Sequence, residues 1–347
     1  MRIEEGGLGL SSRPDHWSRR RFMVALAGSL FAAPLAAEAQ QPGKVARVAI
    51  VVTTTPVSAM TGPNPVHPPV RDLLKALRAL GWIEGQNLLL ERRSAEGRPE
   101  RNGDILRELV ALPCDVIITR GAPMTAEALR ITSTIPIVFT FLDPITLGIV
   151  TSLVGHGRNL TGVTGTGPEL VAKKLEVLRE AVPKARRVAV LAPSIVWNSP
   201  EGEALRAAAS RLAMTLLYAE SGPGDYARAF AAITEQRAEA IFVGGGTYFF
   251  ADRHQIIDFA IKKRLPLMGF TRPFTEAGAL LSYGGNITEY SARTAYLVDR
   301  LLRGVKIADL PIEQIAKFEL VINLKTAKAL GLTIPPSLLQ RADEVIQ

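Results

Sequence analysis

The chain of 347 residues has few of the residue types on which most catalytic and metal sites depend. It contains one cysteine and four histidines. The three histidines beyond residue 40 (His67, His156 and His254) are far apart and lack the spacing of metal ligands. Cys114 has no second thiol with which to form an internal disulfide. These shortages argue against a metal centre and against a disulfide-stabilised scaffold.

Sequence signatures of common enzymes are also missing. Neither the nucleophile pattern G-x-S-x-G nor the phosphate-binding pattern G-x-x-x-x-G-K occurs. The three glycines at 244–246 follow an apolar run, but they do not have the spacing of a dinucleotide-binding loop. We therefore expect no enzymatic activity, no cofactor and no bound metal.

The composition has no strong bias of charge or hydropathy. The net charge is +8, with 47% apolar and 21% charged residues, which is typical of a packed globular protein. The basic residues are scattered and are not interleaved with aromatic residues, so we expect no nucleic-acid binding. A mildly basic surface can attract anionic ligands. The length exceeds what one core usually accommodates, which favours two domains.

One apolar stretch stands out near the start, SRRRFMVALAGSLFAAPLAAEAQQ (18–41). Its apolar run is shorter than the roughly 20 residues needed to span a bilayer, and it contains a proline. It follows three arginines and ends in Ala37-Glu38-Ala39, a small-x-small cleavage pattern. We predict a signal peptide over 1–39, cut near Ala39, and a mature protein in the periplasm. The residues at 18–23 resemble a twin-arginine signal, and an ordinary secretory leader is the alternative.

Beyond the leader, short β-branched runs alternate with amphipathic stretches. This alternation predicts an α/β fold with parallel sheets, built as two Rossmann-like lobes. In the first half we expect strands at 45–52, 87–93, 115–119 and 136–141, with helices at 68–80, 99–111 and 124–130. In the second half we expect strands at 187–192, 215–220, 240–245 and 266–270, with helices at 169–182, 202–213, 226–236 and 251–264.

The last part of the chain repeats the strand–helix pattern, and either sheet could accept it. It contains a strand at 279–284, a helix at 291–304, a strand at 317–323 and an amphipathic stretch at 325–336. We assign 44–150 with about 276–310 to the first lobe, and about 158–272 with about 315–347 to the second.

Ligands of open α/β sheets bind outside the carboxyl ends of the strands. The segments expected there are rich in glycine, hydroxyl groups and helix starts, where free backbone N–H groups can hold a carboxylate or phosphate. They are TTTPVS (53–58), RGAPMT (120–125), LDPITLG (142–148), PSIVWNS (193–199), GGTYFFADR (245–253) and SYGGN (282–286).

The sequence resembles the ABC-transporter substrate-binding proteins of the tryptophan/tyrosine-binding type. The resemblance covers nearly the whole chain and rests on four stretches. These are AQQP (39–42), GWIEGQNLLLERRSAEG (81–97), TIPIVFTFLDPITLGIVTSLVGHGRNLTGVT (134–164) and KFELVINLKTAKALGLTIPPSLLQRADEVIQ (317–347). The family implies the type I periplasmic binding protein fold, with about three crossings at the hinge. It also implies delivery of a ligand to a permease and its ATPase.

The resemblance implies ligand contacts after the strands of both lobes. The matching positions are Thr54, Thr55, Gly121, Ala122, Met124, Asp143, Pro144, Asn198, Tyr248 and Tyr283. For two of these positions a structural role is the alternative. Asp143 with Pro144 can cap the next helix, and Tyr283 can pack at the hinge.

Two residues depart from the family pattern. Trp197 is placed to stack on a flat ligand, and Arg120 stands at a strand end where a small residue is usual. Arg120 can hold a carboxylate through a bidentate pair, or form a salt bridge at the rim. These departures leave the ligand undefined.

We expect a monomeric periplasmic receptor that captures an amino acid or related organic acid by lobe closure, without catalysis. Two alternatives remain open, a ligand-sensing module for a membrane sensor and an exported hydrolase.

Overall fold

The computed structural model describes residues 45–165, 167–222 and 224–347. Within it, Val45–Gln347 forms one compact unit. The predicted leader over 1–39, its twin-arginine pattern and its cut near Ala39 lie outside the described residues. In the described ranges, no helix has both the length and the apolar character needed to cross a bilayer.

The first sheet has six strands, and every pairing in it is parallel. The strand order is β11-β5-β4-β3-β1-β2. The strands are β1 (Ala46–Val52), β2 (Leu88–Ser94), β3 (Val116–Arg120), β4 (Ile137–Thr140), β5 (Leu160–Thr164) and β11 (Glu313–Gln314).

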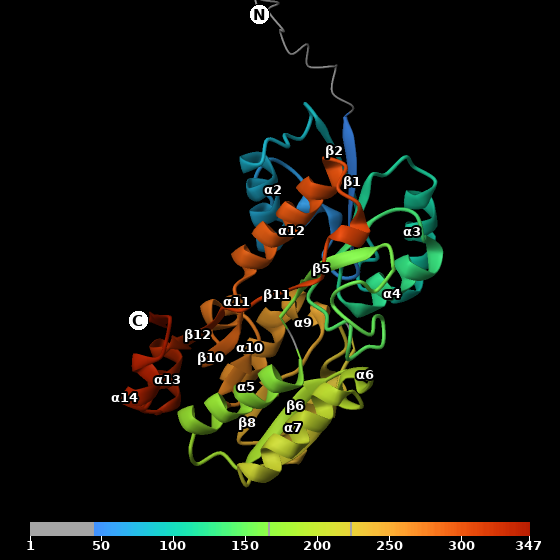
Figure 1. The fold of residues 1–347 in the computed structure, drawn as a ribbon. Helices are drawn as coiled ribbons and strands as arrows, with labels where there is room; N and C mark the ends of the chain where they lie inside the picture. Colours follow the sequence, from blue (N-terminus) through green and yellow to red (C-terminus); the bar gives the residue numbers. More distant parts are fainter. Residues whose placement is uncertain (1–44, 166, 223) are drawn as a thin grey trace, which may run out of the picture. The chain divides into compact units, whose positions relative to one another are not determined.

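Both faces of this sheet are buried, so its central strands are apolar at nearly every position. Alternate residues of β1 serve the two faces: Val48 and Ile50 belong to one core cluster, and Ala49 and Val51 to the other. Two helices cover each face (Figure 1). The first face carries α2 (Pro68–Ala79) and α12 (Ile287–Leu302), and the second carries α3 (Asn102–Val110) and α4 (Ala122–Ile131).

The second sheet has seven strands in the order β13-β12-β10-β9-β8-β6-β7. All its pairings are parallel except β10 with β12, which are antiparallel. The strands are β6 (Arg187–Ala192), β7 (Thr215–Glu220), β8 (Ala240–Val243), β9 (Leu267–Gly269), β10 (Leu281–Gly285), β12 (Phe318–Asn323) and β13 (Glu344–Ile346).

This sheet is also covered on both faces. Val188 and Val190 pack with the helices of one face, and Ala189 and Leu191 with those of the other. The first face carries α5 (Pro168–Ala181), α7 (Pro200–Arg211), α13 (Leu324–Leu330) and α14 (Pro336–Gln340). The second carries α8 (Ala227–Glu235), α9 (Thr247–Ala251), α10 (Arg253–Lys262) and α11 (Arg272–Glu276).

The remaining elements are short and lie in loops. They are α6 (Ser194–Trp197), η1 (Val57–Met60), η2 (Pro99–Arg101) and η3 (Ile307–Asp309).

The predicted α/β fold with two mainly parallel sheets is confirmed. In the described ranges the chain passes from one sheet to the other three times, at 165–167, at 286 and at 315–317. The assignment of segments differs from the expectation in two places. The strand Leu160–Thr164 belongs to the six-stranded sheet because it pairs with β4. The strand Leu281–Gly285, expected in the first lobe, pairs with β9 and β12 of the seven-stranded sheet.

At Gly284, β10 closely approaches the backbone of the segment that follows β9. A Cβ atom at this position would overlap the backbone carbonyl oxygen of Phe270, which cannot rotate away as a side chain can. We expect Gly284→Ala to lower the free energy of unfolding by about 1–3 kcal/mol, the usual cost of overpacking. The measurement is urea unfolding followed by circular dichroism.

Gly222→Ala is the matched control, because no described atom lies within 4 Å of a Cβ placed there. Equal stability of the two variants would show that the approach at Gly284 is looser than the structure has it.

Candidate functional site

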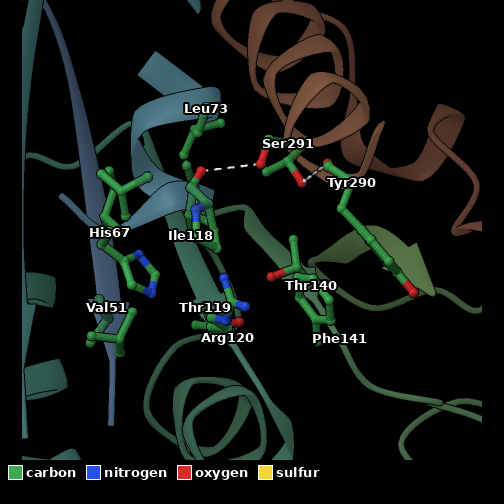
Figure 2. A pocket seen from close by; sticks show the side chains of 15 residues that line it. Val51, His67, Leu73, Ile118, Thr119, Arg120, Thr140, Phe141, Tyr290 and Ser291 are labelled. Carbon is green, nitrogen blue, oxygen red and sulfur yellow. Dashed lines mark hydrogen bonds between the residues drawn. The ribbon is translucent and has the colours of Figure 1, made fainter. Parts of the chain in front are cut away.

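The carboxyl ends of β1, β3 and β4 meet at one edge of the six-stranded sheet and surround two adjoining cavities. The larger has a volume of about 30 Å³ and extends between this sheet and helices α2 and α12 (Figure 2). The smaller, of about 10 Å³, is lined by Val52, Thr53, Thr54, Thr55, His67, Arg120 and Phe250. Val52, His67 and Arg120 line both cavities. Together they have room for one or two water molecules.

Arg120, the last residue of β3, lies against two aromatic rings. Its guanidinium carbon is 4.2 Å from the ring centroid of Phe141 and 5.4 Å from that of Phe250. Phe141 in turn stacks on Tyr290 of α12, with centroids 4.2 Å apart. Tyr290, Phe141, Arg120 and Phe250 therefore form a chain of ring contacts, in which the cation lies near two negatively polarised ring faces.

The backbone of Phe141 is strained. Its φ is +61°, in the left-handed region that a bulky residue seldom adopts. Such conformations cost about 1–3 kcal/mol and occur mostly where the surrounding structure enforces them for a purpose. Here the unusual φ accompanies the stacking of the Phe141 ring between Arg120 and Tyr290.

Arg120 has no counter-charge. Among the described residues, no carboxylate forms an ion pair with it, and no side chain or carbonyl accepts a hydrogen bond from its guanidinium. Burial lowers the pKa of this guanidinium to about 10. Arg120 is half-buried, and a cation with reduced hydration and no acidic partner is unfavourable, so the arrangement favours an incoming anion.

Polar atoms beside Arg120 also lack partners within the described chain. Thr53 Oγ1 and His67 Nδ1 are buried without a hydrogen bond, although their residues are only 8% and 7% exposed. Buried polar groups are nearly always satisfied, and each exception calls for an explanation. A ligand that reaches the smaller cavity would supply the missing partners.

His67 is held neutral by its surroundings. Burial, together with the positive charges of Arg120 and Arg253, lowers its pKa to about 3. Its ring meets that of Phe250 edge to face, with centroids 5.7 Å apart. A neutral imidazole can accept or donate a hydrogen bond to a bound ligand.

Three predicted site residues line the smaller cavity, namely Thr54, Thr55 and Arg120. Of the predicted residues after β3, Gly121 donates its backbone N–H to the carbonyl of Thr140. Ala122 begins α4 and contacts the core on the second face of the six-stranded sheet. Met124 is fully buried in that core. None of these three lines either cavity.

Asp143 takes part in the local turn that it begins. Its Oδ1 accepts from the backbone N–H groups of Ile145 and Thr146, at 3.1 Å each, and its Oδ2 accepts from the Thr146 hydroxyl at 2.6 Å. Pro144 is buried, and its carbonyl accepts from the N–H groups at 149 and 150. These bonds agree with the capping alternative, although the turn is not followed by a helix.

The predicted residues after β6 lie apart from the two cavities. Trp197 stacks on Tyr218, with centroids 4.7 Å apart, and Arg206 lies over its ring at 4.8 Å. Asn198 is exposed at the carboxyl end of α6.

The two predicted tyrosines make structural contacts. The Tyr248 hydroxyl donates to the carbonyl of Ser221 at 2.8 Å. Tyr283 pairs with Leu320 across β10 and β12, and its ring lies 6.0 Å from that of Phe318. Neither tyrosine lines a cavity, which agrees with the packing alternative for Tyr283.

Sequence reasoning missed His67, Phe141 and Phe250 as site residues. Phe250 lies in α9, within the segment 245–253 that the sequence predicts at the ligand, where the predicted contact is Tyr248. Phe141 follows β4 directly, two residues before the predicted Asp143. The position of Phe141 at a strand end was an available signal, whereas the contacts of Phe250 with Arg120 and with His67 depend on long-range packing.

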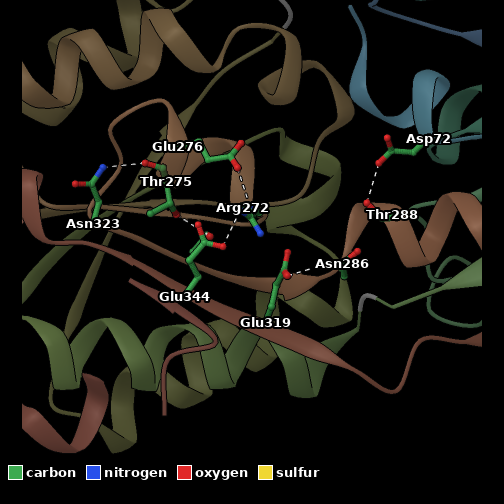
Figure 3. A network of polar contacts seen from close by, with 10 residues as sticks. Asp72, Arg272, Thr275, Glu276, Asn286, Thr288, Glu319, Asn323 and Glu344 are labelled. Atoms are coloured by element: carbon green, nitrogen blue, oxygen red, sulfur yellow. Dashed lines mark hydrogen bonds and ion pairs between the residues drawn. The ribbon is translucent and has the colours of Figure 1, made fainter. Parts of the chain in front are cut away.

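The second crossing, at 286, is fixed by hydrogen bonds on both sides. Asn286 caps α12 by accepting from the N–H of Glu289 at 3.0 Å, and its Nδ2 donates to Glu319 of β12 at 2.9 Å (Figure 3). Thr288 donates to Asp72 of α2 at 2.8 Å. The start of α12 is therefore anchored to elements of both sheets, and Tyr290, which stacks on Phe141, lies in the same first turn, four residues after Asn286.

Comparison with known proteins agrees with this architecture. Residues 65–346 match the family described as ABC transporter substrate binding protein. The chain belongs to this family, as its sequence predicted.

Similar proteins include both curated and structurally solved members. A tyrosine-binding protein of Clostridioides difficile (strain R20291) is 24% identical over 267 residues, which is 76% of each chain. A conserved domain protein from Vibrio cholerae has a TM-score of 0.76 at 27% identity, covering 87% of this chain and 100% of its own. A domain from Streptococcus pneumonia, solved in complex with L-Trp, has a TM-score of 0.74 at 21% identity, covering 87% and 99%.

The lowered pKa of His67 predicts a loss of stability in acid. Because the folded protein holds this imidazole neutral down to about pH 3, the unfolded chain binds the extra proton between about pH 6.5 and 3. The contribution is fully present above pH 6.5 and is lost progressively below it. We expect the loss of this contribution to lower the free energy of unfolding by about 2 kcal/mol between pH 7 and pH 5.

Urea unfolding of wild type and His67→Gln at both pH values measures this contribution. The difference in the free energy of unfolding between pH 7 and pH 5 should shrink in His67→Gln. It should persist in His254→Gln, because His254 is exposed. An undiminished difference in His67→Gln would contradict the assignment.

Proposed function

We propose that this substrate-binding protein serves an ABC importer and captures an amino acid or related organic acid through the guanidinium of Arg120. The observation that carries the proposal is the Arg120 cation between Phe141 and Phe250, which has no ion-pair partner among the residues that the structure describes. A carboxylate is the natural partner, because its two oxygens match the two parallel N–H donors of a guanidinium.

The neighbouring hydroxyls complete the proposed site. Thr53 has a buried, partnerless Oγ1, and Thr54 and Thr55 line the same cavity. Hydroxyls can donate to carboxylate oxygens that Arg120 does not engage. We keep the other predicted positions, from Gly121 to Tyr283, as outer candidates that a ligand larger than the cavity could reach.

Binding requires a rearrangement at Phe250. The two cavities have volumes of about 30 and 10 Å³, which is too small for an amino acid. Phe250 lies against the guanidinium from an element of the seven-stranded sheet, whereas Arg120 belongs to the six-stranded sheet. We propose that the two sheets with their helices act as lobes that open and close about the three crossings, and that opening takes Phe250 off Arg120.

The proposed cellular setting follows from the family and the leader. The mature protein is monomeric in the periplasm after cleavage near Ala39, performs no catalysis, and delivers its ligand to a permease and ATPase. The relatives named above support a small organic ligand. The ligands named for these relatives, tyrosine and L-Trp, make aromatic amino acids the first compounds to test.

Replacing Arg120 tests the proposal directly. A thermal-shift screen of amino acids and organic acids first identifies a ligand, and isothermal titration then gives its dissociation constant for wild type and Arg120→Gln. Removal of one partner of a buried charge pair costs about 2–5 kcal/mol, so affinity should fall at least ~30-fold. The unliganded variant should be no less stable than wild type, because it no longer buries an uncompensated charge.

Arg130→Gln is the control, since Arg130 is exposed and ion-paired with Glu127 on α4. Binding to Arg120→Gln with wild-type affinity would refute the proposed anchor.

A further inference from the structure

We propose that Arg253 is a second cationic anchor of the Arg120 site, and that the preferred ligand is a net-negative organic acid with two anionic groups. This inference rests on the proposed function and narrows its substrate class. It sets the ligand apart from a zwitterionic amino acid, in which the second group is an ammonium.

The geometry places both arginines against one ring. The guanidinium carbon of Arg253, at the start of α10, is 5.0 Å from the ring centroid of Phe250, and that of Arg120 is 5.4 Å from the same centroid. The two carbons can therefore be separated by no more than the sum of these distances. An organic acid with two carboxylates on the same carbon or on neighbouring carbons can bridge such a separation once Phe250 moves.

Arg253 is only partly satisfied. Its Nη1 donates to the carbonyl of Phe250 at 2.7 Å, but its Nε is buried without a partner among the described residues. Glu276 acts on it electrostatically, yet that carboxylate is already paired with Arg272 at 2.7 Å. The guanidinium of Arg253 therefore has free N–H donors that an anionic group can use.

Positive charge accumulates at this point. Both guanidinium groups lower the pKa of His67, which shows that they act on the same small region. The smaller cavity is lined by no acidic residue. Two cations from the two sheets repel each other when they approach, and a dianion between them removes that repulsion.

In the part of the chain that the structure describes, neither cavity is lined by an acidic residue that could pair with an ammonium. Asp143 accepts from the N–H groups of Ile145 and Thr146 and from the Thr146 hydroxyl. Glu201 interacts electrostatically with the buried Lys174 and with Asp143. Like Arg253, these two acids lie outside the cavity lining. Desolvating an ammonium beside two guanidinium groups without an acid is unfavourable.

Ligands that differ at one substituent test the inference. One series is L-phenylalanine, 3-phenyllactate and benzylmalonate, which carry an ammonium, a hydroxyl and a second carboxylate on the same carbon. A second series replaces the phenyl group by an isopropyl group, as in leucine, 2-hydroxyisocaproate and isobutylmalonate. Isothermal titration at pH 7.5 gives each dissociation constant.

We expect the malonate of the better series to bind most tightly and the amino acid least, with at least a tenfold difference between them. In Arg253→Gln, malonate affinity should fall at least tenfold, whereas that of the hydroxy acid should change less than about threefold. In Arg120→Gln, all three affinities should fall.

Arg206→Gln is the matched control. Arg206 also lies over an aromatic ring, that of Trp197, and donates to the carbonyl of the same residue at 2.7 Å. The substitution also removes one positive charge, but at a position away from the cavities. The tighter binding of the malonate relative to the amino acid should therefore persist.

The failing outcomes are distinct. Tightest binding of the amino acid, with dependence on Arg120 but not on Arg253, would overturn this inference and leave the proposed function intact. Binding of none of the six compounds to wild type would overturn both.

Discussion

The guanidinium of Arg120, which has no acidic partner among the described residues, is the constraint around which the rest of the site is organised. A half-buried cation without a carboxylate costs free energy, and two aromatic ring faces offset part of that cost. Phe141 accepts a left-handed backbone conformation in the same contact. His67 is kept neutral beside the charge. The unpaired charge of Arg120, the backbone strain of Phe141 and the burial of His67 each cost free energy. A bound anion would offset part of this cost.

The fold connects this charge to the segments between the sheets. Tyr290, which stacks on Phe141, lies where a Cβ at Gly165 or at Gly285 would overlap its ring. Gly165 begins the first crossing and Gly285 precedes the second. Side-chain contacts therefore run from Arg120 through two rings to two of the three connections. A ligand that moves Phe250 or draws Arg120 toward it acts on the same set of contacts, which gives a physical route from binding to lobe motion.

Local pattern predicted most of the elements, because buried parallel strands and amphipathic helices each have a clear signature. The strands at 187–192 and 215–220 match their predicted bounds. The sheet to which a strand belongs is a long-range property, which explains why 160–164 and 281–285 were placed in the wrong half. Among the predicted site residues, Thr54 and Thr55 came from the family resemblance and Arg120 from its position at a strand end. Phe250 and His67 could not be found in this way, since Phe250 reaches Arg120 and His67 from a distant part of the chain. Arg253 is three residues from Phe250, and its place beside Arg120 depends on the same long-range contact.

A crystal structure of the mature protein with its tightest-binding organic acid tests the central claim most directly. We expect a carboxylate within hydrogen-bonding distance of the Arg120 guanidinium, in the space that Phe250 now occupies. A ligand bound elsewhere, for example against Trp197, with Arg120 still enclosed by Phe141 and Phe250, would contradict it.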